Sequence, residues 1–233
     1  MNPRRIGVLA SGGGSNLGAL LTLLDARAAD GVAEPPVVAC VLSNTPGAGA
    51  LTRAADRGIP TAVLADPTDG AALLALLTQH DIGTVALAGY LRMVPAEVTR
   101  RFAGRMVNVH PSLLPAFGGH GMYGRRVHAA VLAAGATVSG CTAHFVDEVY
   151  DRGPVLAQWP VPVAPDDTPE SLAARVLRAE HALFPRVVAA LAEERLGLGP
   201  DGRVFGRPSL DDAAAFVLGH TSDLARAAAA RVP

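Results

Sequence analysis

Short apolar runs alternate with longer amphipathic ones over the first hundred residues of the chain. The short runs are rich in β-branched residues and lack polar alternation, which is typical of strands buried on both faces. They lie at residues 6–10, 37–43, 61–65, 84–88 and 106–110, and the helical patterns between them span residues 16–29, 47–57, 69–80 and 95–101. Because strands of this kind occur in parallel sheets covered by helices, the pattern predicts an α/β fold with a Rossmann-like, open, mostly parallel sheet and helices on both faces.

The pattern changes after residue 110. A helix is predicted at residues 123–134, and two extended runs follow at residues 138–146 and 155–163. The polar turn that joins these two runs is too short for a parallel crossover, so we expect an antiparallel pair that extends the sheet on its carboxyl-terminal side.

The last long helix has a clear predicted start. Thr168 is a favourable N-cap residue and Pro169 suits the first helical position, so we expect a helix that runs to about Leu196. Pro185 lies inside this run and predicts a kink or a break. A small strand is predicted further on, at residues 203–205.

The domain organisation follows from the absence of internal repeats and long linkers. One domain is expected over residues 1–206, with a nucleotide- or phosphate-binding half at 1–105 and a catalytic half at 106–206. Residues 207–233, which include an alanine-rich stretch with few large apolar side chains, are expected to form an accessory tail.

Composition narrows the class of partner. The 233 residues are 50% hydrophobic and carry a formal net charge of -1, so nucleic acid and anionic membranes are not expected as main partners and small molecules are favoured. Cys40 and Cys141 lie inside apolar runs without paired spacing, which predicts reduced, buried thiols in a cytoplasmic protein and no metal site. The apolar run after the basic start is too short for a signal peptide, and no window reaches the length of a membrane span.

An amide and an imidazole stand two residues apart at the end of the fifth predicted strand. Alternation along a strand places Asn108 and His110 on one face and Val107 on the other. Pro111 keeps the chain extended after them, at the edge of the sheet where open α/β folds bind ligands. This face therefore offers a hydrogen-bond donor beside an acid/base group.

A glycine-rich turn, Ser11-Gly-Gly-Gly-Ser-Asn16, separates the first predicted strand from the first helix. Glycines there allow close backbone approach to an anion, and the helix N-terminus supplies free N-H groups, so the turn predicts phosphate binding. It departs from the dinucleotide fingerprint because Leu17 stands where the third glycine belongs. The alternative is a tight turn that merely requires glycine.

Two further segments are candidate parts of a site. The segment 89–94 follows an apolar strand and suits a slot for a flat heterocycle, although Tyr90 and Met93 are also reasonable core residues. The turn 147–154 carries three acids, and a carboxylate held near His110 would fix its tautomer and raise its pKa above the usual value of about 6.5. The pattern alone leaves open which acid this is.

These segments together resemble a known family. Asn108-Val-His-Pro-Ser-Leu-Leu-Pro115, the glycine-rich turn and the pattern from His144-Phe-Val to Gly153-Pro154 are similar to the folate-dependent phosphoribosylglycinamide formyltransferases of purine synthesis, over roughly residues 5–206. The resemblance implies a one-carbon transferase with a formyltransferase fold. It would pass a formyl group from 10-formyltetrahydrofolate, as co-substrate and without a metal, to the amine of glycinamide ribonucleotide through a tetrahedral intermediate.

The resemblance also implies residue roles. Asn108 would be the oxyanion donor, His110 the general acid, and Asp151 the carboxylate that raises the pKa of His110. The residues implied to bind glycinamide ribonucleotide are Gly14, Ser15 and Asn16 at its phosphate and Glu180 at its ribose. Those implied to bind folate are Leu91, Arg92, Met93, Val94 and Asn108, with the turn 146–151. The resemblance thus implies that the half at 106–206 binds folate as well as carrying the catalytic residues.

Two departures from the family pattern and several alternatives remain. The segment 65–70 lacks an arginine that the family often has, and Leu177 stands where the family often has a lysine, with Arg178 adjacent. The alternatives are formyltetrahydrofolate hydrolase, methionyl-tRNA formyltransferase and a non-catalytic nucleotide-binding module. The hydrolase would carry an additional amino-terminal domain, and the tRNA enzyme a further domain and a basic surface. A monomer or a homodimer is expected.

Overall fold

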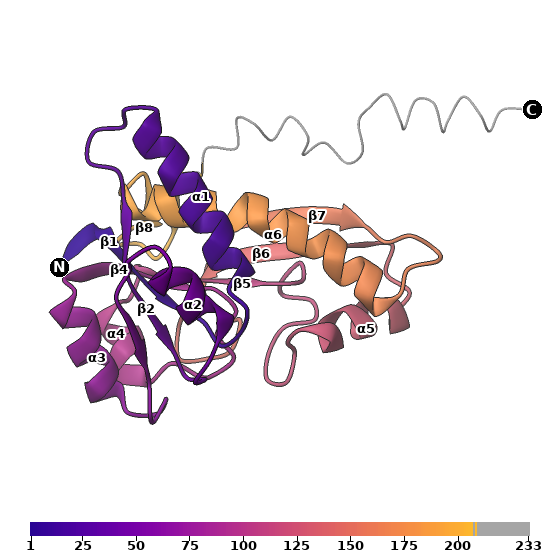
Figure 1. The fold of residues 1–233 in the computed structure, drawn as a ribbon. Helices are drawn as coiled ribbons and strands as arrows, with labels where there is room; N and C mark the ends of the chain where they lie inside the picture. Colours follow the sequence, from indigo (N-terminus) through magenta and orange to yellow (C-terminus); the bar gives the residue numbers. More distant parts are fainter. Residues whose placement is uncertain (207, 209–233) are drawn as a thin grey trace, which may run out of the picture.

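The computed structural model describes residues 1–206 and 208 and contains one large sheet (Figure 1). The seven strands lie in the order β3-β2-β1-β4-β5-β6-β7, and a separate two-stranded sheet pairs β8 with β9. The strands are β1 (Asn2–Leu9), β2 (Val37–Ser43), β3 (Thr61–Val63), β4 (Ile82–Leu87), β5 (Met106–His110), β6 (Val138–Phe145), β7 (Val155–Pro162), β8 (Leu196–Leu198) and β9 (Val204–Gly206). The accessory tail predicted at residues 207–233 lies outside the described residues except for Pro208.

The sheet is parallel from β3 to β5 and antiparallel from β5 to β7. The predicted mostly parallel, Rossmann-like sheet with an antiparallel extension is therefore confirmed. The chain reverses its direction of strand addition between β1 and β4, and open α/β sheets bind ligands beside such a point because the loops on either side diverge there.

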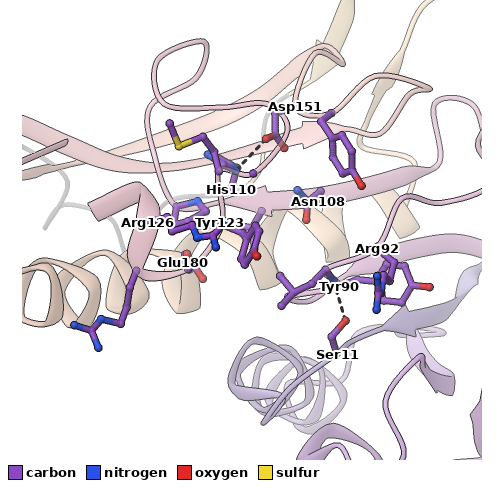
Figure 2. Close-up of a pocket in the computed structure, with 18 of the residues that line it drawn as sticks. Ser11, Tyr90, Arg92, Asn108, His110, Tyr123, Arg126, Asp151 and Glu180 are labelled. Carbon is purple, nitrogen blue, oxygen red and sulfur yellow. Dashed lines mark hydrogen bonds and ion pairs between the residues drawn. The ribbon is translucent and has the colours of Figure 1, made fainter. Parts of the chain in front are cut away.

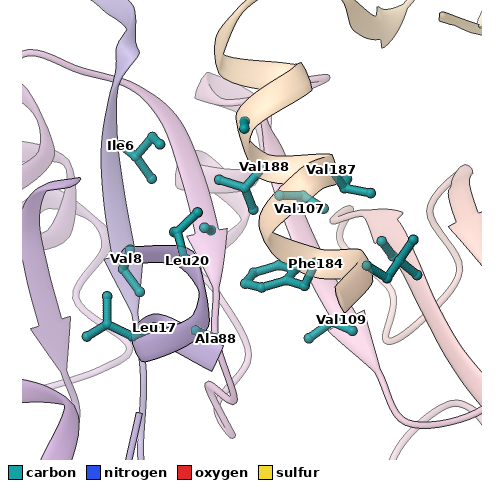
Figure 3. Packing of buried hydrophobic residues seen from close by; sticks show 14 of the residues in the cluster. Ile6, Val8, Leu17, Leu20, Ala88, Val107, Val109, Phe184, Val187 and Val188 are labelled. Atoms are coloured by element: carbon teal, nitrogen blue, oxygen red, sulfur yellow. The ribbon is translucent and has the colours of Figure 1, made fainter. Parts of the chain in front are cut away.

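Helices cover both faces of the sheet, as predicted. They are α1 (Ser15–Ala29), α2 (Gly49–Ala55), α3 (Gly70–Gln79), α4 (Ala96–Arg101), α5 (Arg125–Ala133) and α6 (Pro169–Ala192). One core cluster unites residues of α1, α2 and α6 with one face of the sheet, and a second cluster unites α3 and α4 with the other face. Figure 3 shows how Phe184, Val187 and Val188 of α6 approach the strand residues Val107 and Val109.

The longest helix does not break at its internal proline. Thr168 caps α6 through a capping box with Ser171, and the helix continues without interruption through Pro185 to Ala192. Of the kink or break predicted at Pro185, the break is therefore wrong. Proline removes one backbone hydrogen bond, but the helix buries Pro185 together with the apolar side chains of Phe184 and Val187, and this apolar burial outweighs the lost bond.

Some helices and strands begin or end at other residues than predicted, and the causes can be identified. Helix α6 ends before the predicted Leu196 because residues 196–198 pair with residues 204–206 as strands β8 and β9, a contact that requires the intervening turn. The strand predicted at residues 203–205 is present, whereas β8 was not predicted. Helix α5 begins at Arg125, so Tyr123 stays in the preceding loop.

The register of β5 has the predicted alternation. Val107 and Val109 point into the first core cluster, while Asn108 and His110 lie on the opposite face and line a cavity. In the antiparallel pair, Asn108 lies opposite His144 and His110 opposite Thr142. The extension of the sheet therefore delivers a second imidazole to the face that carries the amide and the first one.

Two leucines of α6 test how much the first core cluster stabilises the fold. Leu183 is fully buried and Leu177 is 37% exposed. We expect Leu183→Ala to lower the free energy of unfolding by about 2–5 kcal/mol, because it removes buried methyl groups and leaves a cavity, and Leu177→Ala by less than about 1 kcal/mol. Urea denaturation measures both, and equal losses would contradict this account of the core.

Candidate active site

A cavity of about 910 Å³ opens at the carboxyl ends of the central parallel strands (Figure 2). Ser11 follows β1, Asn44 follows β2, and Gly89 to Arg92 follow β4, and all of them line it. Ser11 connects these loops, since its hydroxyl donates to Asn44 Oδ1 at 2.6 Å and accepts from the backbone N-H of Leu91 at 2.8 Å. The loops that form the floor are thus held together by one side chain.

His110 lies in the wall of this cavity with an acceptor on each side of its ring. Its Nε2 lies 2.9 Å from the carbonyl oxygen of Phe117, and its Nδ1 lies 3.4 Å from Asp151 Oδ2, so whichever nitrogen carries the proton has an acceptor within reach. Among the three acids of the 147–154 turn, only Asp151 contacts the imidazole within the described residues. The structure therefore brings together the predicted histidine and the predicted aspartate.

Asp151 is aimed at His110 by the shape of its turn. Its backbone is left-handed, with φ 56°, a conformation that aspartate tolerates better than most residues. Its Oδ2 accepts the backbone N-H of Gly119 at 2.9 Å, which ties the turn to the loop after β5. A Cβ on Gly153 would lie 1.9 Å from the carbonyl oxygen of Phe145, so glycine is required where the turn rejoins the sheet.

Asn108 contacts a histidine that the sequence did not single out as a site residue. His144 Nδ1 donates to the Phe145 carbonyl at 2.8 Å, which leaves Nε2 of the neutral ring as an acceptor for Asn108 Nδ2 at 3.2 Å. The same Nε2 lies 3.6 Å from Asp151 Oδ1. His144 was part of the family pattern, but only the β5/β6 register shows that it lies between the amide and the carboxylate.

The pKa of His110 corrects one expectation. Burial lowers this pKa below 6.5, and the effect of burial exceeds the opposing effects of the Asp151 charge and the Phe117 hydrogen bond, while the neighbouring His144 lowers it further. Asp151 does favour the charged ring as predicted, but the predicted net rise is wrong because the side chain is almost fully out of water. Burial alone would raise the pKa of Asp151, yet the two histidines and the Gly119 N-H together lower it.

Of the three predicted substrate-binding residues in the glycine-rich turn, one lines the cavity and two do not. Gly14 is the N-cap of α1 with φ 72° and is buried, Ser15 is exposed, and neither lines the cavity. Asn16 does line it, and its Nδ2 donates to Glu180 Oε2 at 2.7 Å. Helix α1 and helix α6, distant in sequence, therefore meet at one buried amide-carboxyl contact at the edge of the cavity.

Glu180 is an unusual carboxyl group because it is 7% exposed and no cation pairs with it within the described chain. Burial raises its pKa to about 7, and the hydrogen bond from Asn16 only partly opposes this rise. A group that titrates near neutrality at the wall of a cavity suits the binding of hydroxyl groups, because its carboxylate form accepts hydrogen bonds.

The predicted folate segment adjoins both sides of Asn108. Leu91 and Arg92 line the large cavity, and a second cavity of about 50 Å³ is lined by Arg92, Met93 and Val94, by His144 and by residues of the turn after β6, with Asn108 lining both cavities. Tyr90 and Val94 are core residues of the second cluster, whereas Leu91, Arg92 and Met93 are exposed. The alternative of a core role is thus correct for Tyr90 and wrong for Met93.

The loop and helix after β5 add residues that sequence reasoning missed. Tyr123, Arg126 and His128 line the large cavity, and the guanidinium of Arg126 lies 5.0 Å from the centre of the Tyr123 ring. His128 is buried on α5, and burial lowers its pKa. The available signal was Tyr123 just before an amphipathic helix and Arg126 at its start, but this signal does not reveal which face of the helix adjoins the cavity.

The two cysteines belong to the buried interior of the protein. Cys40 and Cys141 are free and buried, burial raises the pKa of both thiols, and neither lines the cavity. Residues 1–206 and 208 contain no group of three or more His, Cys, Asp or Glu side chains arranged to hold a metal ion. None of the helices in these residues is long and apolar enough to cross a membrane.

The buried carboxyl of Glu180 should make the free energy of unfolding depend on pH. Since its folded pKa is about 7 and its normal value is 4.5, its contribution to stability is present below pH 4.5 and is lost as the pH rises through 7. The change in the free energy of unfolding caused by Glu180→Gln should therefore be about 3 kcal/mol more favourable at pH 8 than at pH 4.5. Denaturant titration at the two pH values measures it. Glu170→Gln, at an exposed carboxyl of the same helix whose pKa is lowered, is the control and should give no such gain.

Comparisons with known proteins agree with the geometry. A model of the formyl transferase family matches residues 4–188. The chloroplastic phosphoribosylglycinamide formyltransferase of Arabidopsis thaliana is 44% identical over 209 residues, which cover 86% of this chain and 70% of the plant protein.

Solved structures give the same result. The phosphoribosylglycinamide formyltransferase of Anaplasma phagocytophilum is 38% identical with a TM-score of 0.77, over 86% of this chain and 91% of that one. A formyltetrahydrofolate deformylase of Pseudomonas syringae is also similar, at 27% identity and a TM-score of 0.74, over 87% of this chain and 65% of that one. The resemblance to phosphoribosylglycinamide formyltransferases found in the sequence is thus confirmed, and the chain belongs to the formyl transferase family.

Proposed function

We propose that this protein transfers the formyl group of 10-formyltetrahydrofolate to the amine of glycinamide ribonucleotide, giving formylglycinamide ribonucleotide and tetrahydrofolate in purine biosynthesis. The observation that carries this proposal is the convergence of Asn108, His110 and Asp151 where two cavities adjoin. The relatives named phosphoribosylglycinamide formyltransferase support the choice of reaction.

Each substrate has a suitable side of Asn108. The nucleotide substrate would lie in the large cavity, with its phosphate at Gly14, Ser15 and Asn16 and its ribose hydroxyls at the Glu180 carboxylate. The folate would enter from the side of residues 91–94 and the turn 146–151, where the second cavity has an apolar wall and Arg92 at its edge. The amine and the formyl group would then meet in front of Asn108.

Asn108 is suited to stabilise the oxyanion that forms when the amine attacks the formyl carbon. Its Nδ2 carries two N-H groups, and the contact with His144 uses one of them. The other remains for the developing negative charge, an interaction that contributes about 3 kcal/mol where a single such donor has been removed from other enzymes. His144 thus orients the donor rather than competing for it.

His110 would move the proton between the two nitrogens. Because its pKa lies below 6.5, the ring is mostly neutral at pH 7 and can accept the proton that the attacking amine must lose. The imidazolium so formed is stabilised by Asp151 and then acts as the general acid toward the leaving folate nitrogen. The ring would accept that proton at Nε2, in the tautomer that carries its own proton on Nδ1 facing Asp151, after the substrate nitrogen has taken the place of the Phe117 carbonyl.

The alternatives are less well supported. Transfer to water, as in a deformylase, needs no nucleotide-sized cavity with a buried Asn16 and Glu180 in its wall. Transfer to initiator tRNA favours a basic surface, whereas the net charge here is -1. A cytoplasmic location and a monomeric or homodimeric state stay predictions.

Replacing His110 tests the proton-transfer role. We expect His110→Ala to lower kcat with 10-formyltetrahydrofolate and glycinamide ribonucleotide by about 100-fold or more, because a positioned general acid/base contributes about that much. His80→Ala, at the carboxyl end of α3 and away from the cavity, should leave kcat unchanged. A loss of less than about tenfold in His110→Ala would show that this side chain does not carry the proton.

The acceptor itself is tested by a direct comparison. Purified protein is incubated with 10-formyltetrahydrofolate and either glycinamide ribonucleotide, water alone or initiator tRNA, and tetrahydrofolate release is followed. We expect release to depend on glycinamide ribonucleotide. Equal release without any added acceptor would identify a hydrolase instead, and release that depends on tRNA would identify the third activity.

A further inference from the structure

Helix α2 holds the glycine-rich turn in a defined orientation. The backbone N-H of Ala50 donates to the Gly12 carbonyl at 3.1 Å, and Arg53 Nε donates to the Gly13 carbonyl at 2.9 Å. A Cβ on Gly14 would lie 2.7 Å from the Cα of Ala50, so the turn and the helix approach more closely than side chains allow. Two successive carbonyl groups of the turn therefore face α2.

This orientation decides where the amides of the turn point. In a trans peptide the N-H and the C=O lie on opposite sides, so the N-H groups of Gly13 and Gly14 point away from α2. Within the described residues, no acceptor bonds the N-H groups of Gly13, Gly14, Ser15 or Asn16. Successive free amides at the start of a helix form an anion-binding concavity.

A buried side chain next to these amides also lacks a partner. Asn16 is 6% exposed and lines the cavity, and its Oδ1 accepts no hydrogen bond from the described part of the chain. A buried acceptor of this kind normally has a partner, which indicates a ligand with a donor group at this position. The free amides and this acceptor together suit a phosphorylated sugar.

Arg53 is the only side chain within residues 1–206 and 208 that bonds a carbonyl of the turn. Its NH1 lies beside Gly18 on the first turns of α1, where a Cβ would be 3.6 Å away, and no carboxylate in that part of the chain pairs with it. Its charge is therefore not neutralised by a neighbouring acid. Arg57, four residues further on, does pair with Asp25 Oδ2 at 2.6 Å.

We propose that Arg53 is a positioning residue for the phosphate of the nucleotide substrate. It holds the Gly13 carbonyl so that the Gly14 N-H faces the phosphate, and its unpaired guanidinium adds positive potential at the turn. This inference rests on the proposed function for the identity of the substrate.

The test compares Arg53→Gln with Arg57→Gln on two substrates, glycinamide ribonucleotide and its dephosphorylated riboside. We expect Arg53→Gln to raise KM for the ribonucleotide by about tenfold or more, as for loss of a charge-assisted hydrogen bond, with little change in kcat and none in KM for the riboside. Arg57→Gln should match the wild type on both. An unchanged KM for the ribonucleotide, or an equal rise for both substrates, would overturn the proposal.

A measurement without turnover separates this inference from the proposed function. Inorganic phosphate should raise the thermal midpoint of the wild type and of Arg57→Gln, and should raise that of Arg53→Gln much less. Arg53→Lys, which keeps the charge but not the planar Nε donor, serves as a second variant and should lie between them. If the wild type does not use glycinamide ribonucleotide, the proposed function fails, while the phosphate shifts still decide the role of Arg53. Equal shifts in all variants would show that Arg53 has no such role.

Discussion

The withdrawal of ionisable side chains from water is the constraint on which this site depends. His110 and Glu180 are both almost fully buried, and each has a pKa displaced in the direction that makes its charged form less stable. The fold tolerates them because each has a partner at the right distance, Asp151 for the imidazole and the Asn16 amide for the carboxyl. The same burial raises the pKa of Glu180 to about 7 and lowers the pKa of His110, so each group favours its uncharged form.

The antiparallel extension of the sheet supplies the partners. Strand β6 places His144 opposite Asn108, and the turn into β7 returns Asp151 to the face that carries His110. A parallel crossover would have carried the chain to the far end of the sheet before it formed another strand. The change of strand direction after β5 is thus what lets residues about 40 positions apart in the sequence form one contact network.

The two cavities share their central wall. Asn108 borders both, so groups bound in the two cavities would meet at the same amide. Hydrogen bonds hold the loops at the carboxyl ends of the strands together. Ser11 bonds the segments after β2 and β4, and Arg53 bonds the glycine-rich turn to α2. A site formed between such braced loops loses little conformational freedom when its substrates bind.

The sequence by itself determined the architecture and the identity of the central residues. Unbroken apolar runs predicted the parallel strands, the short polar turn predicted the antiparallel pair, and the two-residue spacing of Asn108 and His110 predicted a shared face, because these signals are local and follow from strand geometry. Only the tertiary structure decided the position of His144 beside Asn108, the continuity of α6 through Pro185 and the direction in which the pKa of His110 shifts. These properties depend on strand register, on apolar burial and on desolvation, respectively. Each of the three arises from contacts between residues far apart in the sequence, so no local pattern contains it.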